Sequence, residues 1–121
     1  MRTEKITLAN IYDCYNYGKK VAENSISIGT AAVYVSQNGM DKGSAHIYLR
    51  CVKSMIHGER YTGTVNEQAT RHFLVAILSD YGFDGLRKAL ESVRLHLEYQ
   101  KSYQTLSGIK AIYAEFNEYL P

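Results

Sequence analysis

The chain has 121 residues, with 14 lysines and arginines, 12 aspartates and glutamates, and a formal net charge of +2. This length suits one domain that buries about two-thirds of its unfolded surface, so the fold needs no metal or disulfide to hold it. The near balance of charge argues against a protein that binds polyanions over its whole surface, although it is compatible with a local basic patch.

Apolar residues recur at helical spacing along nearly the whole chain, and no convincing strand pattern occurs. The only proline is the last residue, so no proline interrupts a helix. We expect a single all-α domain over residues 1–121, a compact orthogonal bundle of five or six helices with a helix-turn-helix-like hairpin. The expected helices span residues 8–22, 28–37, 42–57, 66–81, 84–101 and 108–119.

In the first predicted helix, Thr7 is placed to cap the N-terminus, because a threonine hydroxyl accepts one of the unpaired backbone N–H groups there. Gly18 lies inside the same helix. A glycine at that position either weakens the helix locally or allows a neighbouring helix to approach closely.

Residues 27–57 are the stretch around which the rest of the chain is organised, a short helix and a longer one around a turn. Gly39 supplies the positive φ that commonly ends a helix, and Asp41 is a natural N-cap for the helix that follows. Two helices around a glycine turn are the skeleton of a helix-turn-helix, whose second helix enters the major groove in DNA-binding examples. Here the turn is about one residue longer than in the DNA-reading form.

The second helix of this hairpin carries polar side chains suited to double-stranded DNA, because lysine and arginine bind phosphates or guanine edges and serine binds either. The predicted contacts on it are Lys42, Ser44, His46, Arg50 and Lys53. Positive charge is concentrated here, since residues 42–60 hold four lysines and arginines and one glutamate. The competing interpretation is an αα-hairpin that only packs, because a fold does not imply a function.

Residues 58–65 form the clearest loop, in which two glycines bracket Arg60 and Tyr61. An arginine beside a tyrosine suits stacking on a nucleic acid, so both residues join the predicted DNA-binding set. The alternative, which we favour, is that the pair pins the loop to the body of the domain, because a loop between long helices needs an anchor.

No catalytic, metal or cofactor motif occurs in the sequence, and the acidic residues are scattered singly. His46 and His57 share a helix face but lie about 16 Å apart along the axis, too far to ligate one ion. We therefore predict no catalytic residue, no metal site and no cofactor, and a protein that is not an enzyme on its own.

Cys14 and Cys51 are the only cysteines, and they lack the spacing of a C-x-x-C motif. The sequence shows no secretory signal and no apolar run long enough to cross a membrane. We expect a cytoplasmic protein with no membrane partner, in which both thiols are small buried apolar groups and a disulfide between them is not required.

Several runs of residues resemble a helical N-terminal region that precedes the nuclease domain in some bacterial restriction-type HNH endonucleases. These runs are Gly39–Ala45, Gly58–Asn66, Ala69–Leu74, Asp80–Gly82, Gly85–Leu86, Ala89–Leu90 and Val93–Tyr99. The Cys or His metal-and-base set of an HNH nuclease is missing, so the resemblance implies an accessory domain that recognises DNA or mediates assembly. No catalytic residue is carried over from it.

Two functions follow as hypotheses. The first is a non-catalytic DNA-binding or specificity domain of a restriction or defence nuclease system. The second is a protein–protein interaction module, either a dimerisation domain or a small inhibitor of a bacterial or phage defence enzyme. The near-neutral charge and the 11 tyrosines fit this second function equally well, because tyrosine suits interfaces.

Overall fold

The computed structural model describes residues 5–121, which form helices joined by turns and loops, with no strand among them. The helices are α1 (Leu8–Ala22), α2 (Ile28–Gln37), α3 (Lys42–His57), α4 (Glu67–Gln100) and α5 (Ser107–Asn117). The predicted all-α fold is therefore confirmed. The predicted domain also includes residues 1–4, which lie outside the described part of the chain.

Helix starts are set by the side chains that the sequence places there. Thr7, Asp41 and Asn66 each accept a hydrogen bond from the backbone N–H three residues further along, at the starts of α1, α3 and α4. Each bond satisfies one of the N–H groups that a helix start leaves unpaired. The predicted boundaries agree with the observed ones to within two residues, apart from the two predicted helices that α4 joins.

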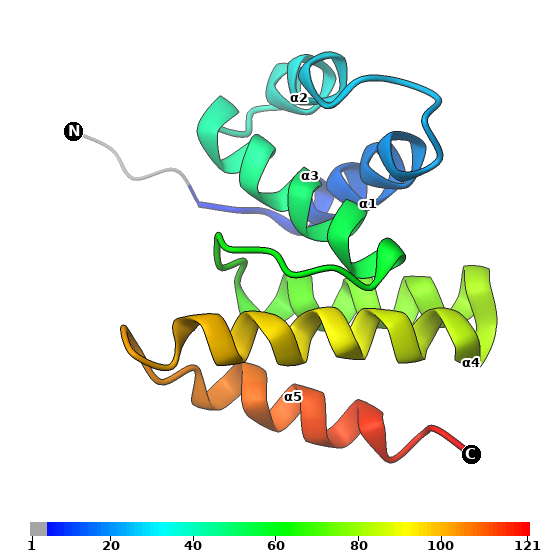
Figure 1. Ribbon diagram of the computed structural model, residues 1–121. Helices are drawn as coiled ribbons and strands as arrows, with labels where there is room; N and C mark the ends of the chain where they lie inside the picture. The colour runs from blue at the N-terminus through cyan, green and yellow to red at the C-terminus, as the bar shows by residue number, and fades with distance from the viewer. Residues whose placement is uncertain (1–4) are drawn as a thin grey trace.

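Helix α4 contains the sharpest change of direction in the bundle. Gly82 has φ 73° and ψ −164°, which is not a helical conformation, and the two halves of α4 run back alongside each other from this point (Figure 1). The predicted separate helices 66–81 and 84–101 are these two halves. A residue with a Cβ rarely adopts this backbone conformation, so glycine is what permits the reversal.

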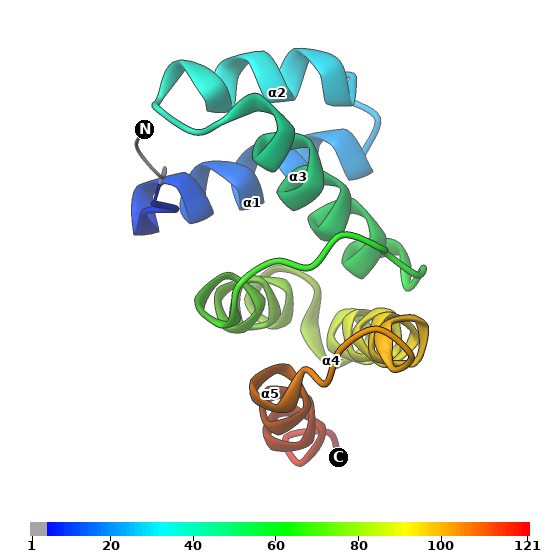
Figure 2. The same ribbon diagram turned by 90° about the vertical axis from the view of Figure 1, so that its left-hand side faces the viewer.

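The helices form crossed layers. Figure 1 shows α1 and α2 end-on where α4 and α5 lie lengthways, and Figure 2 shows the reverse. Helix α3 lies between these layers and packs on α1, α2 and α4. Helix α5 covers the face of α4 opposite to α3 (Figure 1).

The core lies where α3 crosses α1 and α4. Its largest fully buried apolar side chains are Phe73, Ile11, Leu49, Met55, Leu74, Ile77 and Leu86. Helices α1 and α3 approach closely at Gly18, where an added Cβ would lie 2.6 Å from the Cβ of Val52. Of the two roles predicted for this glycine, the structure therefore shows close approach.

Candidate nucleic-acid interface

The hairpin of α2 and α3 has the turn that the sequence predicts. Gly39 has a φ of 97°, and the Asp41 carboxylate accepts the backbone N–H of Ser44 at 3.1 Å. This geometry presents α3 beside α2 in the manner of a helix-turn-helix. The hairpin alone carries no function, so the side chains on α3 decide what it contacts.

Four predicted contact residues lie along one stripe of α3. At about 100° per residue they fall within about 80° of one another around the helix axis. They are Lys42, His46, Arg50 and Lys53. Ser44 projects about 120° away from Arg50, so the structure does not bring it to this stripe. Ser44 is half-buried away from this stripe, and its contact with DNA stays a prediction.

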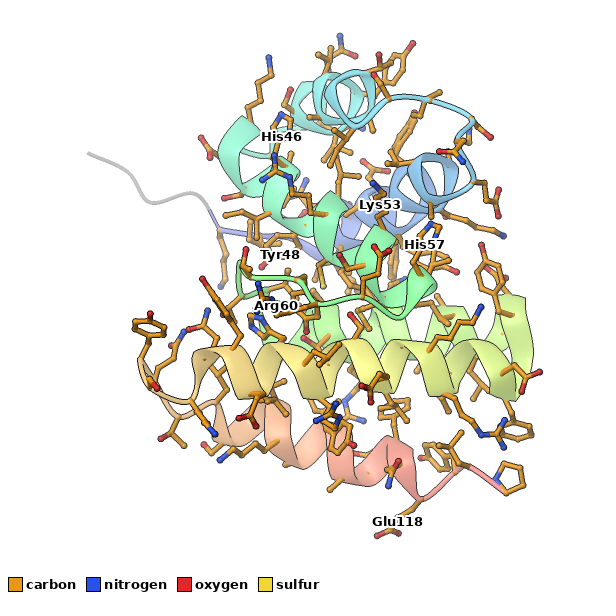
Figure 3. The ribbon with its side chains drawn as sticks, in the orientation of Figure 1. His46, Tyr48, Lys53, His57, Arg60 and Glu118 are labelled. Atoms are coloured by element: carbon orange, nitrogen blue, oxygen red, sulfur yellow. The ribbon has the colours of Figure 1, made fainter. Side chains whose placement is uncertain are left out.

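A groove of about 380 Å³ lies between α3 and the loop that follows it. Its lining comes from Ile28, Ile47, Arg50, Lys53, Ser54, Glu59, Arg60, Tyr61, Thr62 and Gly63. Figure 3 shows Lys53 on α3 above Arg60 on the loop. Lys42 and His46 are not part of the lining, so the predicted residues divide between the groove and the first turns of α3.

The loop 58–65 is fixed by a row of polar side chains on the second half of α4. Ser92 donates its hydroxyl to the carbonyl oxygen of Glu59, and the Gln100 side-chain amide donates to that of Thr62 at 2.9 Å. Between them, His96 Nδ1 lies 2.7 Å from the carbonyl oxygen of Tyr61. These three residues are spaced four apart, so they share one face of the helix. Together they hold three carbonyl groups of the loop backbone against α4.

His96 is the central anchor of this row, and only 1% of its surface is exposed. A carbonyl oxygen only accepts, so Nδ1 carries the proton and Nε2 accepts from the Thr64 hydroxyl at 3.0 Å. Burial lowers the pKa of the imidazole, which favours this neutral form. This role of His96 was not predicted from the sequence. The signal for its real role was the four-residue spacing of polar side chains on an amphipathic helix.

Tyr61 does not belong to the exposed surface. It is 4% exposed, and its ring stacks on His96 with centroids 4.2 Å apart and planes 11° from parallel. The prediction that Tyr61 contacts DNA is corrected, because its aromatic face is already used inside the domain. The favoured alternative, in which this pair of residues pins the loop, holds for Tyr61.

Arg60 points the other way, into solvent. Its guanidinium lies 4.7 Å from the centroid of the Tyr99 ring, a cation–π arrangement, and it also lines the groove. Tyr99 is followed by Tyr103, whose ring centroid is 6.3 Å from that of Tyr99. Arg60 therefore connects the basic groove to a pair of exposed aromatic rings.

The groove cations are not used in ion pairs within residues 5–121. The ion pairs of that range involve Lys19, Arg71, Arg87, Arg94 and Lys101 as the cations. Arg50, Lys53 and Arg60 are all exposed, and Glu59 is the one carboxylate in the groove lining. Three like charges around one groove repel one another, so an anion placed there relieves the repulsion.

His46 has one ring nitrogen with a defined role. Its Nδ1 is buried and has no hydrogen-bond partner among the described residues. Because Nδ1 is enclosed, Nε2 is the ring nitrogen of His46 that is left for a partner outside the domain.

The chain offers few groups for covalent chemistry. Cys14 and Cys51 are free and buried, as predicted, and burial raises the pKa of the Cys14 thiol to about 12. A thiol with such a pKa is scarcely ionised near neutral pH and is a poor nucleophile. Across residues 5–121, no three His, Cys, Asp or Glu side chains gather as metal ligands would.

Comparison of the chain with family models, with curated proteins and with solved structures finds no match. The resemblance to the accessory region of restriction-type HNH endonucleases therefore stays a prediction. Of the helices in the described part of the chain, none has the length and apolar character needed to cross a membrane.

Proposed function

We propose that the chain is a non-catalytic DNA-binding module that contacts phosphates through the groove between α3 and the loop 58–65. The observation that carries this proposal is the convergence of Arg50, Lys53 and Arg60 on one groove, where they form no ion pair within residues 5–121. Phosphate contacts supply most of the affinity of such proteins and fix their register on DNA.

The remaining α3 residues extend this surface toward the turn of the hairpin. Lys42 adds a cation and His46 adds its Nε2 nitrogen, both on the same stripe as Arg50. A helix-turn-helix reads bases from the start of its second helix, which is where these two residues lie. The wider role in a restriction or defence nuclease system rests on the resemblance and forms part of the same proposal.

The test is a salt-titrated binding assay with double-stranded DNA. The test variant replaces Arg50, Lys53 and Arg60 with alanine. The matched control replaces Lys20, Lys88 and Lys110, which are exposed cations outside the groove, so both variants lose the same charge.

We expect wild type to bind with a Kd on the order of micromolar at low salt. In the test variant, the slope of log K against log salt should fall by about 0.9 for each phosphate that the protein no longer neutralises. The control should bind as wild type does. Equal weakening of binding in both variants would mean that net charge, and not the groove, attracts the DNA.

A second candidate function is a protein–protein interaction module, which exposed aromatic rings favour. Tyr12 and Tyr34 are each 45% exposed, and Tyr34 stacks on Tyr17 across α1 and α2 with centroids 5.5 Å apart. Sedimentation over a range of concentrations tests this candidate. A strictly monomeric chain that captures no protein partner would count against it.

A further inference from the structure

Resting on the proposed function, we propose that the DNA bound at this groove includes unpaired nucleotides, with phosphates at Arg50, Lys53 and Arg60 and a base stacked on Tyr103. The ligand class is therefore single-stranded DNA, or a duplex that carries a single-stranded extension. Three features of the surface lead to this inference.

The first feature is the size and position of the groove. Its volume of about 380 Å³ falls at the small end of the range for small-molecule sites, which is compatible with a nucleotide-sized group. The groove is bounded on one side by α3 and on the other by the loop (Figure 3). The cations therefore line a recess that a single strand enters more readily than a double helix does.

The second feature is the aromatic pair of Tyr99 and Tyr103, which lies outside the groove lining and is reached from it through Arg60. Tyr103 is 77% exposed, the largest exposed fraction among the large apolar and aromatic side chains that stand out on the described surface, and Tyr99 is 38% exposed. Base stacking needs a free aromatic face and a base with a free face, and paired bases inside a duplex present only their edges. Exposed rings beside phosphate-binding cations are therefore typical of single-strand sites.

The third feature is the connection between these parts. Arg60 lines the groove and also lies over the Tyr99 ring, so it stands between the phosphate positions and the rings. Gln100, the residue after Tyr99, donates a hydrogen bond to the Thr62 carbonyl oxygen and ties this end of α4 to the loop. The loop backbone near Arg60 and the end of α4 that carries Tyr99 are thus held together by a hydrogen bond.

Two carboxylates, those of Glu98 and Glu59, lie near this site. Glu98 on the last turns of α4 pairs with Lys101, so its charge is offset close to the rings. Glu59 is the one carboxylate that lines the groove, against three cations. Three cations against one carboxylate leave the groove lining with a net positive charge, which favours a polyanion.

Fluorescence anisotropy with three labelled probes tests the proposal. The probes are an oligothymidine of about 12 nucleotides, which matches the site sizes of single-strand binders, a blunt duplex, and the same duplex with an unpaired thymidine extension. The test variants are Tyr103→Ala and Tyr99→Leu. Tyr119→Ala is the control, because Tyr119 is also exposed but lies beyond the far end of α5. Circular dichroism checks that each variant is folded.

We expect the extended duplex and the oligothymidine to bind more tightly than the blunt duplex. Tyr103→Ala should weaken binding of the two probes with unpaired bases by about fivefold or more and leave the blunt duplex unchanged. The control should bind all three probes as wild type does.

Equal affinity of blunt and extended duplexes, or an unchanged affinity of Tyr103→Ala for the extended probe, would overturn the inference and leave DNA binding itself standing. If none of the three probes binds at low salt, the proposed function fails together with the inference.

Discussion

Gly82 offers the sharpest test of the fold, because a substitution there changes the backbone and nothing else. Its φ of 73° and ψ of −164° lie in a region that is essentially restricted to glycine. A Cβ added at Gly82 would have no heavy atom within 4 Å. The Gly82→Ala substitution therefore creates no collision, and its whole cost is the strained backbone at the reversal of α4.

The expected cost follows from two opposing terms. Holding alanine in this conformation destabilises the folded protein by about 1–3 kcal/mol. Alanine also lowers the conformational entropy of the unfolded chain, which stabilises the protein by about 0.4–1 kcal/mol. We expect Gly82→Ala to lower the free energy of unfolding by about 1–2 kcal/mol, a large share of the roughly 5–15 kcal/mol typical of a domain.

Gly29→Ala is the matched control, because it makes the same chemical change inside α2 at a residue without positive φ. The added Cβ would be 4.0 Å from its nearest neighbour, the Ser27 hydroxyl oxygen. Alanine has a higher helix propensity than glycine, so this variant should gain up to about 1 kcal/mol.

Urea denaturation followed by far-ultraviolet circular dichroism measures both effects. The two variants should move the unfolding midpoint in opposite directions with the slope m unchanged. A Gly82→Ala protein as stable as wild type would show that the two halves of α4 do not meet through a positive-φ residue.

Three further predictions concern packing, protonation and thiol access. Gly18→Ala should destabilise by about 1–2 kcal/mol in urea denaturation, because overpacking against Val52 outweighs the gain in helix propensity; equal stability would contradict the close approach of α1 and α3. Because burial lowers the pKa of His96, the unfolded chain takes up the proton first, so the free energy of unfolding should fall as pH drops below about 6.5. His96→Gln should flatten this dependence, and an identical pH profile would refute it. Cys14 and Cys51 should resist iodoacetamide in the folded protein and react in urea, as mass spectrometry would show, since both are buried with raised pKa values; rapid labelling of folded protein would oppose this.

The sequence was sufficient for features whose causes are local. Caps at Thr7 and Asp41 and the positive φ of Gly39 depend on residues within one turn, and all three are as predicted. The sequence was also sufficient to show that Ser44 lies off the stripe of Lys42 and His46. Ser44 is two residues from each of them, and a separation of two residues places side chains on opposite sides of a helix. Its inclusion among the contacts came from residue type alone.

The parts that the sequence did not reveal depend on contacts across long separations. Nothing in the loop indicates that Tyr61 turns inward while Arg60 turns outward. That division is decided by His96, 35 residues away from Tyr61, which stacks on the ring and binds the backbone beside it. Polar side chains four residues apart on a helix predict that the helix face has a hydrogen-bonding partner. Only the folded chain shows that this partner is the backbone of the loop 58–65.

The anchored loop and the groove cations together explain how a nearly neutral protein forms a basic site. Residues 42–60 hold four lysines and arginines and one glutamate, while the rest of the chain holds ten and eleven. Bringing Arg60 beside Arg50 and Lys53 adds repulsion to the folded state, which hydrogen bonds from α4 to the loop offset. The fold thus keeps these cations in place before any anion arrives, and a preorganised site loses less entropy when it binds.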